Sequence, residues 1–164
     1  MEFINVGKIV NTHALKGELR IMSDFRHKAQ VFKKGMKVYV GKKKEEFTIN
    51  TYRFHKIYDM VTFKGYNNIN DVEYLKGLDV YINEDDLDLD GDIYSGKLIG
   101  FNVINDNKSI GKVTEIIDTP ANEVIRVDKD ILIPYVNEFI EKIDLDKKEI
   151  YVKGIGGLLW NLKY

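Results

Sequence analysis

Six carboxylates crowd the nine residues 84–92, EDDLDLDGD, in the middle of the 164-residue chain. Four residues of this stretch match positions 1, 3, 5 and 6 of an EF-hand calcium loop: Asp86, Asp88, Asp90 and Gly91. The twelfth position, which should be a bidentate Glu, is Lys97, and the flanking segments have strand patterns rather than helical ones. We therefore expect a solvated, self-repelling linker, and a calcium-responsive adaptor is the weaker alternative.

A second polar segment, NTHALKGELRI (11–21), carries His13, Lys16 and Arg20 around a glycine that permits a tight turn. No Ser or Asp is placed beside His13 to form a catalytic triad, and no second acid–base partner can be named. Cationic side chains and backbone N–H groups in a loop do suit a phosphate. The segment thus favours anion binding over catalysis, with a purely structural histidine as the plainer interpretation.

Lysines dominate the positive charge of the chain, which has 21 Lys and 4 Arg. Six of the lysines lie in the segment 33–46, which is typical of a solvated hairpin tip. Such charge suits non-specific contact with a nucleic-acid backbone better than bidentate base recognition.

The sequence offers little for a cofactor. Cysteine is absent, which excludes disulfides, thiol catalysis and cysteine zinc sites. The glycines of GIGGLLW (154–160) lack the strand and helix of a dinucleotide site. We expect no cofactor, metal or catalytic residue. The first residues do not resemble a signal peptide, and no run of about 18 apolar residues could span a membrane, so a cytoplasmic protein is expected. We also expect a monomer.

Charge divides the chain into two halves. Residues 1–83 hold 15 basic and 9 acidic side chains, a net charge of +6, whereas residues 84–164 hold 10 and 17, a net charge of −7. Two halves of opposite net charge suggest two domains with different partners. We predict a basic domain over 1–83, an acidic linker over 84–92 and an acidic domain over 93–164.

Short apolar runs with a period of two predict strands in both halves. A single short helix is expected within NINDVEYLKG (68–77), capped by Asn70 and ended by Gly77. In the second half, residues 105–109 predict a hairpin turn, and Pro134 should lie at a strand edge or end. The fold class predicted is all-β: two small β-barrels, the first six-stranded with one short helix.

Several motifs, in order along nearly the whole chain, resemble the RimM family of bacterial ribosome maturation factors. Gly7, Lys8 and Ile9 are followed by HALKGE (13–18), in which Ala14 replaces the family's glycine. DVEYLKGLDVYI resembles the signature that precedes the linker. The later motifs match a PRC-barrel domain: LIGFNV, IGKVTEII, ANEVI, LIPYV and IDLD.

The resemblance implies a non-enzymatic assembly factor that binds small-subunit ribosomal protein nineteen in the head of the immature 30S subunit and assists 16S rRNA processing. The family's binding signature is Tyr-Tyr, Trp and then D-L-[IM]-G. Tyr94 matches its second Tyr, while Ile, Ser and Lys replace the first Tyr, the Trp and the Asp at 93, 95 and 97. The expected partner-binding residues are Ile93, Tyr94, Leu98 and Ile99. The expected rRNA contacts are Lys8, His13, Lys16 and Arg20.

Two other functions remain as alternatives. A cofactor-binding barrel enzyme would need an acid–base pair or a cofactor motif, and neither is found. The calcium-responsive adaptor would use residues 86–97. Because barrels host many functions, the fold alone cannot choose among the three hypotheses.

Overall fold

The computed structural model describes residues 2–89 and 92–159. The chain forms two compact units, Met1–Gly91 and Asp92–Tyr164. Within the described residues, no helix combines the length and the hydrophobicity that crossing a membrane requires.

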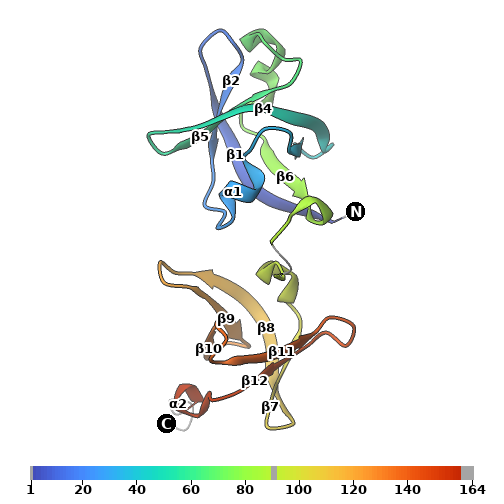
Figure 1. Cartoon of the computed structure of the whole chain (residues 1–164), viewed down its shortest axis with the longest axis vertical. Coiled ribbons are helices and arrows are strands. Elements are labelled where there is room, and N and C mark those ends of the chain that lie inside the picture. The colour runs from blue at the N-terminus through green and yellow to red at the C-terminus, as the bar shows by residue number, and fades with distance from the viewer. Residues whose placement is uncertain (1, 90–91, 160–164) are drawn as a thin grey trace. The chain divides into compact units, whose positions relative to one another are not determined.

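The first unit is a closed barrel with strand order β1-β2-β5-β4-β3-β6 (Figure 1). Its strands are β1 (Phe3–His13), β2 (Glu18–Met22), β3 (Lys37–Val40), β4 (Glu45–His55), β5 (Tyr58–Phe63) and β6 (Asp79–Asn83). Figure 1 shows β4 and β5 continuing past the barrel as a long hairpin. The predicted six-stranded barrel is confirmed for this unit.

The strict alternation expected along β1 is broken at Gly7, where the register to β6 shifts. Ile4 and Val6 are buried, but the next buried residue is Ile9, so Lys8 stays exposed. A Cβ atom on Gly7 would lie 2.8 Å from the carbonyl oxygen of Met22. A glycine is therefore needed where β1 passes closely over β2.

The helix expected around residues 70–77 is instead two short 3-10 helices, η1 (Ile69–Asp71) and η2 (Glu73–Leu75). The cap is Asn68, whose side chain accepts a hydrogen bond from the backbone of Asn70. The prediction of one continuous helix capped by Asn70 was wrong, because this earlier cap starts the turn two residues sooner. The structure also has a helix that was not predicted, α1 (Lys28–Val31).

The acidic segment begins as part of the first unit rather than as a free linker. Residues Glu84–Asp86 form the 3-10 helix η3, capped by the Asn83 side chain. The backbone N–H of Glu84 donates to the carbonyl of Glu2 at 2.9 Å. The linker expected from residue 84 thus starts with a turn that is attached to the barrel.

The second unit is a curved sheet with strand order β10-β9-β8-β7-β12-β11 (Figure 1). Its strands are β7 (Asn102–Asn105), β8 (Lys108–Asp118), β9 (Glu123–Val127), β10 (Ile131–Pro134), β11 (Ile140–Asp144) and β12 (Glu149–Val152). It also contains the 3-10 helix η4 (Ser95–Leu98) and the short helix α2 (Gly156–Leu159). The all-β prediction therefore holds for both units.

Two local predictions in this unit are confirmed. Asp106 and Asn107 both have positive φ, 49° and 64°, in the two-residue turn that joins β7 to β8. This backbone suits a hairpin turn and favours Asp and Asn. Pro134 ends β10, which is an edge strand, so its missing N–H costs the sheet nothing.

Candidate functional site

The segment that opens the second unit is held by its own turn and by β9. The backbone N–H of Lys97 donates to the carbonyl of Tyr94 at 3.0 Å, which closes η4. The Ser95 hydroxyl is buried and donates to the Glu123 carboxylate at 2.6 Å. Ser95, which replaces the family's Trp, therefore anchors this turn to the sheet.

The Tyr94 ring folds back over Gly96. A Cβ atom on Gly96 would lie 2.6 Å from Cε1 and 2.7 Å from the hydroxyl oxygen of Tyr94. Only a glycine leaves room for the ring in this position. Gly96 was not among the predicted site residues, although its position two residues after Tyr94 places it within reach of the ring.

The four predicted partner-binding residues occupy different environments. Ile93 is half-buried and packs against the apolar core of the unit, and Tyr94 is also half-buried. The side chain of Ile99 is 53% exposed. Its apolar surface is therefore accessible, whereas Ile93 packs partly on the core.

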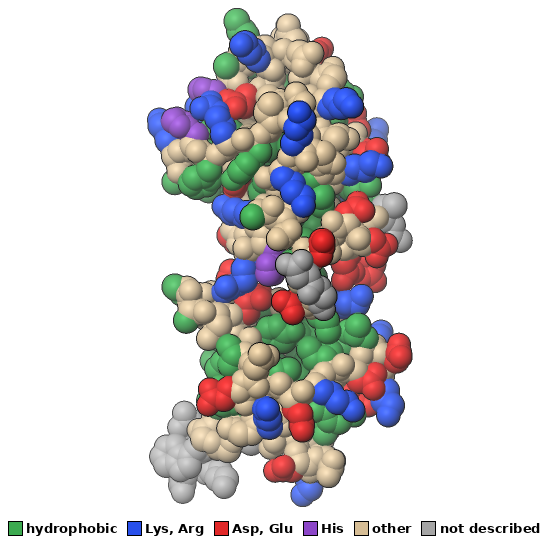
Figure 2. Space-filling view, in the orientation of Figure 1, with side chains coloured by type: hydrophobic (Ala, Val, Ile, Leu, Met, Phe, Trp, Pro, Cys, Tyr) green, Lys and Arg blue, Asp and Glu red, His purple; other side chains and the backbone are tan. Residues whose placement is uncertain are grey.

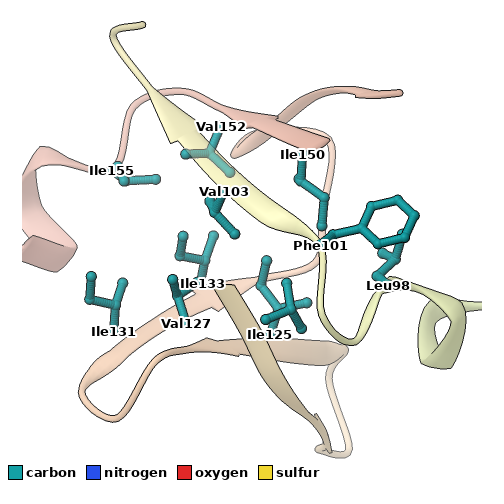
Figure 3. Packing of buried hydrophobic residues seen from close by; sticks show 11 residues of the cluster. Leu98, Phe101, Val103, Ile125, Val127, Ile131, Ile133, Ile150, Val152 and Ile155 are labelled. Carbon is teal, nitrogen blue, oxygen red and sulfur yellow. The ribbon is translucent and has the colours of Figure 1, made fainter. Parts of the chain in front are cut away.

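Leu98 was expected at the binding surface, and the structure corrects that prediction. Its side chain is 0% exposed. Figure 3 shows Leu98 beside Phe101, at one end of the core cluster of the second unit. The one-turn helix η4 directs Leu98 into the core and leaves the next residue, Ile99, exposed.

Two carboxylates, Glu123 and Asp92, lie near this segment. Burial, followed by the negative charges of Glu123 and Asp92, raises the pKa of Tyr135 above its ordinary value. Both carboxylates are therefore close to Tyr135, a side chain that packs on the same core as Ile93. The segment thus combines an exposed apolar residue with two acidic neighbours, which suits a basic protein.

In the first unit, the structure brings His13 and Arg20 together. Arg20 Nη2 lies 2.8 Å from His13 Nδ1. Since arginine only donates, His13 Nδ1 accepts and its ring proton is on Nε2. The Arg20 guanidinium also lies 5.4 Å from the centre of the Tyr58 ring. These contacts fix a cation on the outer face of the barrel.

Glu18 is an acidic residue among these basic side chains, and it pairs with His13 across β1 and β2. Arg53 on β4 donates two hydrogen bonds to it, at 2.8 and 2.7 Å. The bond to Arg53 is the main reason that the pKa of Glu18 is lowered, and the charges of Arg53, His13 and His55 add to the effect, against an opposing contribution from burial. Glu18 therefore remains ionised and organises the cations around it.

A groove of about 660 Å³ lies beside this pair. Its lining residues are Ala14, Lys16, Glu18, Asn50, Thr51, Arg53, Thr62 and Asn67. We call Lys16, Arg20, Arg53, His13 and His55 the basic face. Strands β1, β2 and β4 and the turn between β1 and β2 carry these side chains, and their basic character suits an anion.

Lys8, the remaining predicted rRNA contact, lies apart from the groove. It pairs with Met22 at the far end of β2, while His13 pairs with Glu18 at the near end. Arg53 and His55 were missed in the sequence, although their alternate positions on β4 place them on one face. The fragment RFH (53–55), directly before the hairpin turn, could have indicated them in the sequence.

Ala14 adopts a φ of +64°, the left-handed conformation that favours glycine. Ala14, which replaces the family's glycine, therefore adopts a backbone conformation that glycine adopts more easily. The loop therefore carries local strain at Ala14, while Lys16 lines the groove.

The acidic stretch with the calcium-loop match is only partly described, because Asp90 and Gly91 lie outside the described residues. Within residues 2–89 and 92–159, no group of three or more His, Asp or Glu side chains could hold a metal ion.

Sequence comparison identifies the family. A profile of the RimM N-terminal domain matches residues 4–87, and one of the RimM PRC barrel domain matches residues 96–158. The chain belongs to the RimM family. The prediction made from the ordered motifs is confirmed.

Relatives within the RimM family match over their whole length. The Ribosome maturation factor RimM of Staphylococcus saprophyticus is 39% identical, over 95% of this chain and 98% of the relative. The one from Exiguobacterium sibiricum is 40% identical, over 97% and 99%. A crystal structure of a putative 16S ribosomal RNA processing protein RimM from Pseudomonas aeruginosa shares 21% identity over 93% of this chain and 97% of that one, with a TM-score of 0.43.

Proposed function

We propose that this chain is a non-enzymatic ribosome maturation factor. In this proposal it binds small-subunit ribosomal protein nineteen in the 30S head and assists 16S rRNA processing and small-subunit assembly. Support comes from its family membership and from the name Ribosome maturation factor that its full-length relatives carry.

The geometry at Ile99 carries the partner-binding part of the proposal. Ile99 is 53% exposed on a turn that Ser95 anchors to β9, so its apolar surface needs no rearrangement to dock. Preorganisation lowers the entropic cost of binding. The nearby carboxylates Asp92 and Glu123 attract a basic ribosomal protein, and Tyr94 contributes aromatic area to the same contact.

Calorimetry of the full chain with its own species' ribosomal protein nineteen tests this site. We expect Tyr94→Ala to weaken binding by about 1–3 kcal/mol, the range of an interface anchor. The matched control is Leu145→Ala, because Leu145 is an exposed apolar residue (43%) of the same unit, between β11 and β12. Equal affinities of the two variants would contradict the assignment, and an unfolded Tyr94→Ala variant would show that Tyr94 is a core residue.

The basic face supports a second part of the proposal, contact with 16S rRNA. Cations held in place by His13 and Glu18 can meet phosphates without ordering long side chains. We expect the affinity for an rRNA fragment to fall as salt rises, and Arg20→Ala to reduce the salt slope by about one. Salt-independent binding, or no binding at low salt, would contradict the rRNA contact but not the contact with the ribosomal protein.

A further inference from the structure

The hairpin of β4 and β5 ends in exposed apolar side chains that the basic face does not use. Phe54 is 58% exposed and Ile57 is 61% exposed. In Figure 2 hydrophobic side chains gather over this hairpin next to basic and histidine side chains. Large apolar side chains grouped on a projecting hairpin mark a contact surface, because side chains that stay exposed to water do not stabilise the folded chain.

The Phe54 ring lies next to an ion pair whose carboxylate is buried. Asp59, which pairs with Phe54 across the hairpin, is 0% exposed and accepts a hydrogen bond from Tyr52 at 2.6 Å. Lys28 of α1 lies 2.9 Å from the same carboxylate and 5.4 Å from the centre of the Phe54 ring. The Tyr52 ring in turn stacks on Phe32, with centroids 6.1 Å apart. The exposed Phe54 ring therefore lies next to side chains whose positions are fixed by these contacts.

The tip of the hairpin carries cations but few carboxylates. Asp59 is the only carboxylate in the hairpin segment 45–63 beyond Glu45 and Glu46, and it is buried and paired with Lys28. Arg53 and Lys56 supply cations close to the turn. Arg53 and Lys28 already neutralise Glu18 and Asp59, so the carboxylates near the tip do not repel an anion. An exposed aromatic ring next to the exposed Lys56 therefore suits a ligand that is both anionic and aromatic.

We propose that the tip of the β4–β5 hairpin is a stacking site for an unpaired RNA base. Phe54 and Ile57 contact the base, and Lys56 contacts a flanking phosphate. This inference rests on the RNA-binding part of the proposed function, and it specifies the form of RNA: single-stranded, recognised by stacking rather than by base edges.

Fluorescence anisotropy of the full chain with a labelled oligouridylate of about ten nucleotides tests the proposal, since this length spans a typical single-strand site. We expect Phe54→Ala to raise Kd roughly tenfold, the loss of one stacked base, without changing the salt slope. Phe54→Tyr should restore binding. Lys56→Ala should reduce the slope by about 0.7, the value for one phosphate contact on a single strand.

Tyr74→Ala is the matched control, because Tyr74 is an aromatic residue of equal exposure (57%) that donates to Glu45 elsewhere on the barrel. Its Kd should equal that of the unaltered protein. If Phe54→Ala binds as well as Tyr74→Ala does, the stacking site is wrong, although the basic face keeps its RNA contact. If the unaltered protein does not bind RNA at low salt, both fail. If Phe54→Ala impairs only binding to the ribosomal protein, the tip is a protein contact and the inference is overturned.

Discussion

The ammonium of Lys28 on α1 lies 2.9 Å from the carboxylate of Asp59 on β5, and the Asp59 side chain is fully buried. Removing Lys28 would leave that carboxylate with its hydrogen bond from Tyr52 and no countercharge. An unpaired buried charge is strongly destabilising, more so than the loss of the pair as a whole.

We therefore expect Lys28→Ala to lower the free energy of unfolding of the first unit by about 1–3 kcal/mol, less than for a fully buried pair because solvent screens the partly exposed lysine. The double variant Lys28→Ala/Asp59→Asn should regain part of this loss, since the charge is gone. Urea denaturation measures both. A double variant less stable than Lys28→Ala would contradict the account.

The Tyr52 hydroxyl should titrate late. Burial, and then its hydrogen bond to Asp59 and the charge of that residue, raise the pKa of Tyr52 to about 12. Because this exceeds the unfolded value of about 10, the contribution to stability is complete below about pH 10 and is lost as pH rises towards 12. In an absorbance titration, Tyr52→Phe should lose one tyrosine that ionises near the alkaline end.

Tyr74→Phe serves as the comparison for that titration. The pKa of Tyr74 is also raised to about 12, by burial and by its bond to Glu45. Each variant should lose one late-titrating group, and Tyr52→Phe alone should weaken the hairpin. The loss of an early group in Tyr52→Phe would show that the Tyr52–Asp59 bond does not form in solution.

Ala14→Gly should stabilise the first unit. The left-handed φ of Ala14 costs about 1–2 kcal/mol, and the greater freedom of glycine in the unfolded chain takes back part of that gain. We expect a net increase of about 0.5–1 kcal/mol in the free energy of unfolding, measured by urea denaturation. Gly65→Ala, at another turn glycine with positive φ (88°) and an open Cβ position, should have the opposite sign.

Gly96→Ala should weaken partner binding without touching any partner atom. The new methyl group would collide with the Tyr94 ring, which must swing away. We expect a loss of about 1–2 kcal/mol in binding to ribosomal protein nineteen, comparable with losing one anchor. Gly100→Ala is a poor control because φ is +91° there, whereas Gly157→Ala meets no atom within 4 Å. Native affinity in Gly96→Ala would show that the ring position is irrelevant.

The sequence predicted the strands well, because alternation and turn residues are local signals. The turn at Asp106–Asn107 and the edge position of Pro134 follow from single-residue chemistry. Helix α1 has no such signal: His27 provides no side-chain cap, and the helix is held by tertiary contacts such as Lys28 with Asp59. Tertiary contacts of this kind are invisible to local patterns.

The candidate sites were predicted in part for the same reason. His13, Lys16 and Arg20 lie close in sequence, so their common location could be inferred. Arg53 joins them only through the pairing of strands, across 35 residues to Glu18. Leu98 was wrongly expected at the surface, because a family motif gives the residue type but not the direction of its side chain. That direction depends on the turn η4.

The most direct test of the central claim replaces the chromosomal gene with one that encodes Tyr94→Ala and Ile99→Ser, and measures unprocessed 16S rRNA and free 30S subunits. The account predicts that both accumulate as in a strain that lacks the gene, while the protein stays folded and at normal abundance. A Leu145→Ala strain should process its rRNA normally. Normal processing in the double-variant strain would contradict the claim that this segment joins the protein to the maturing subunit.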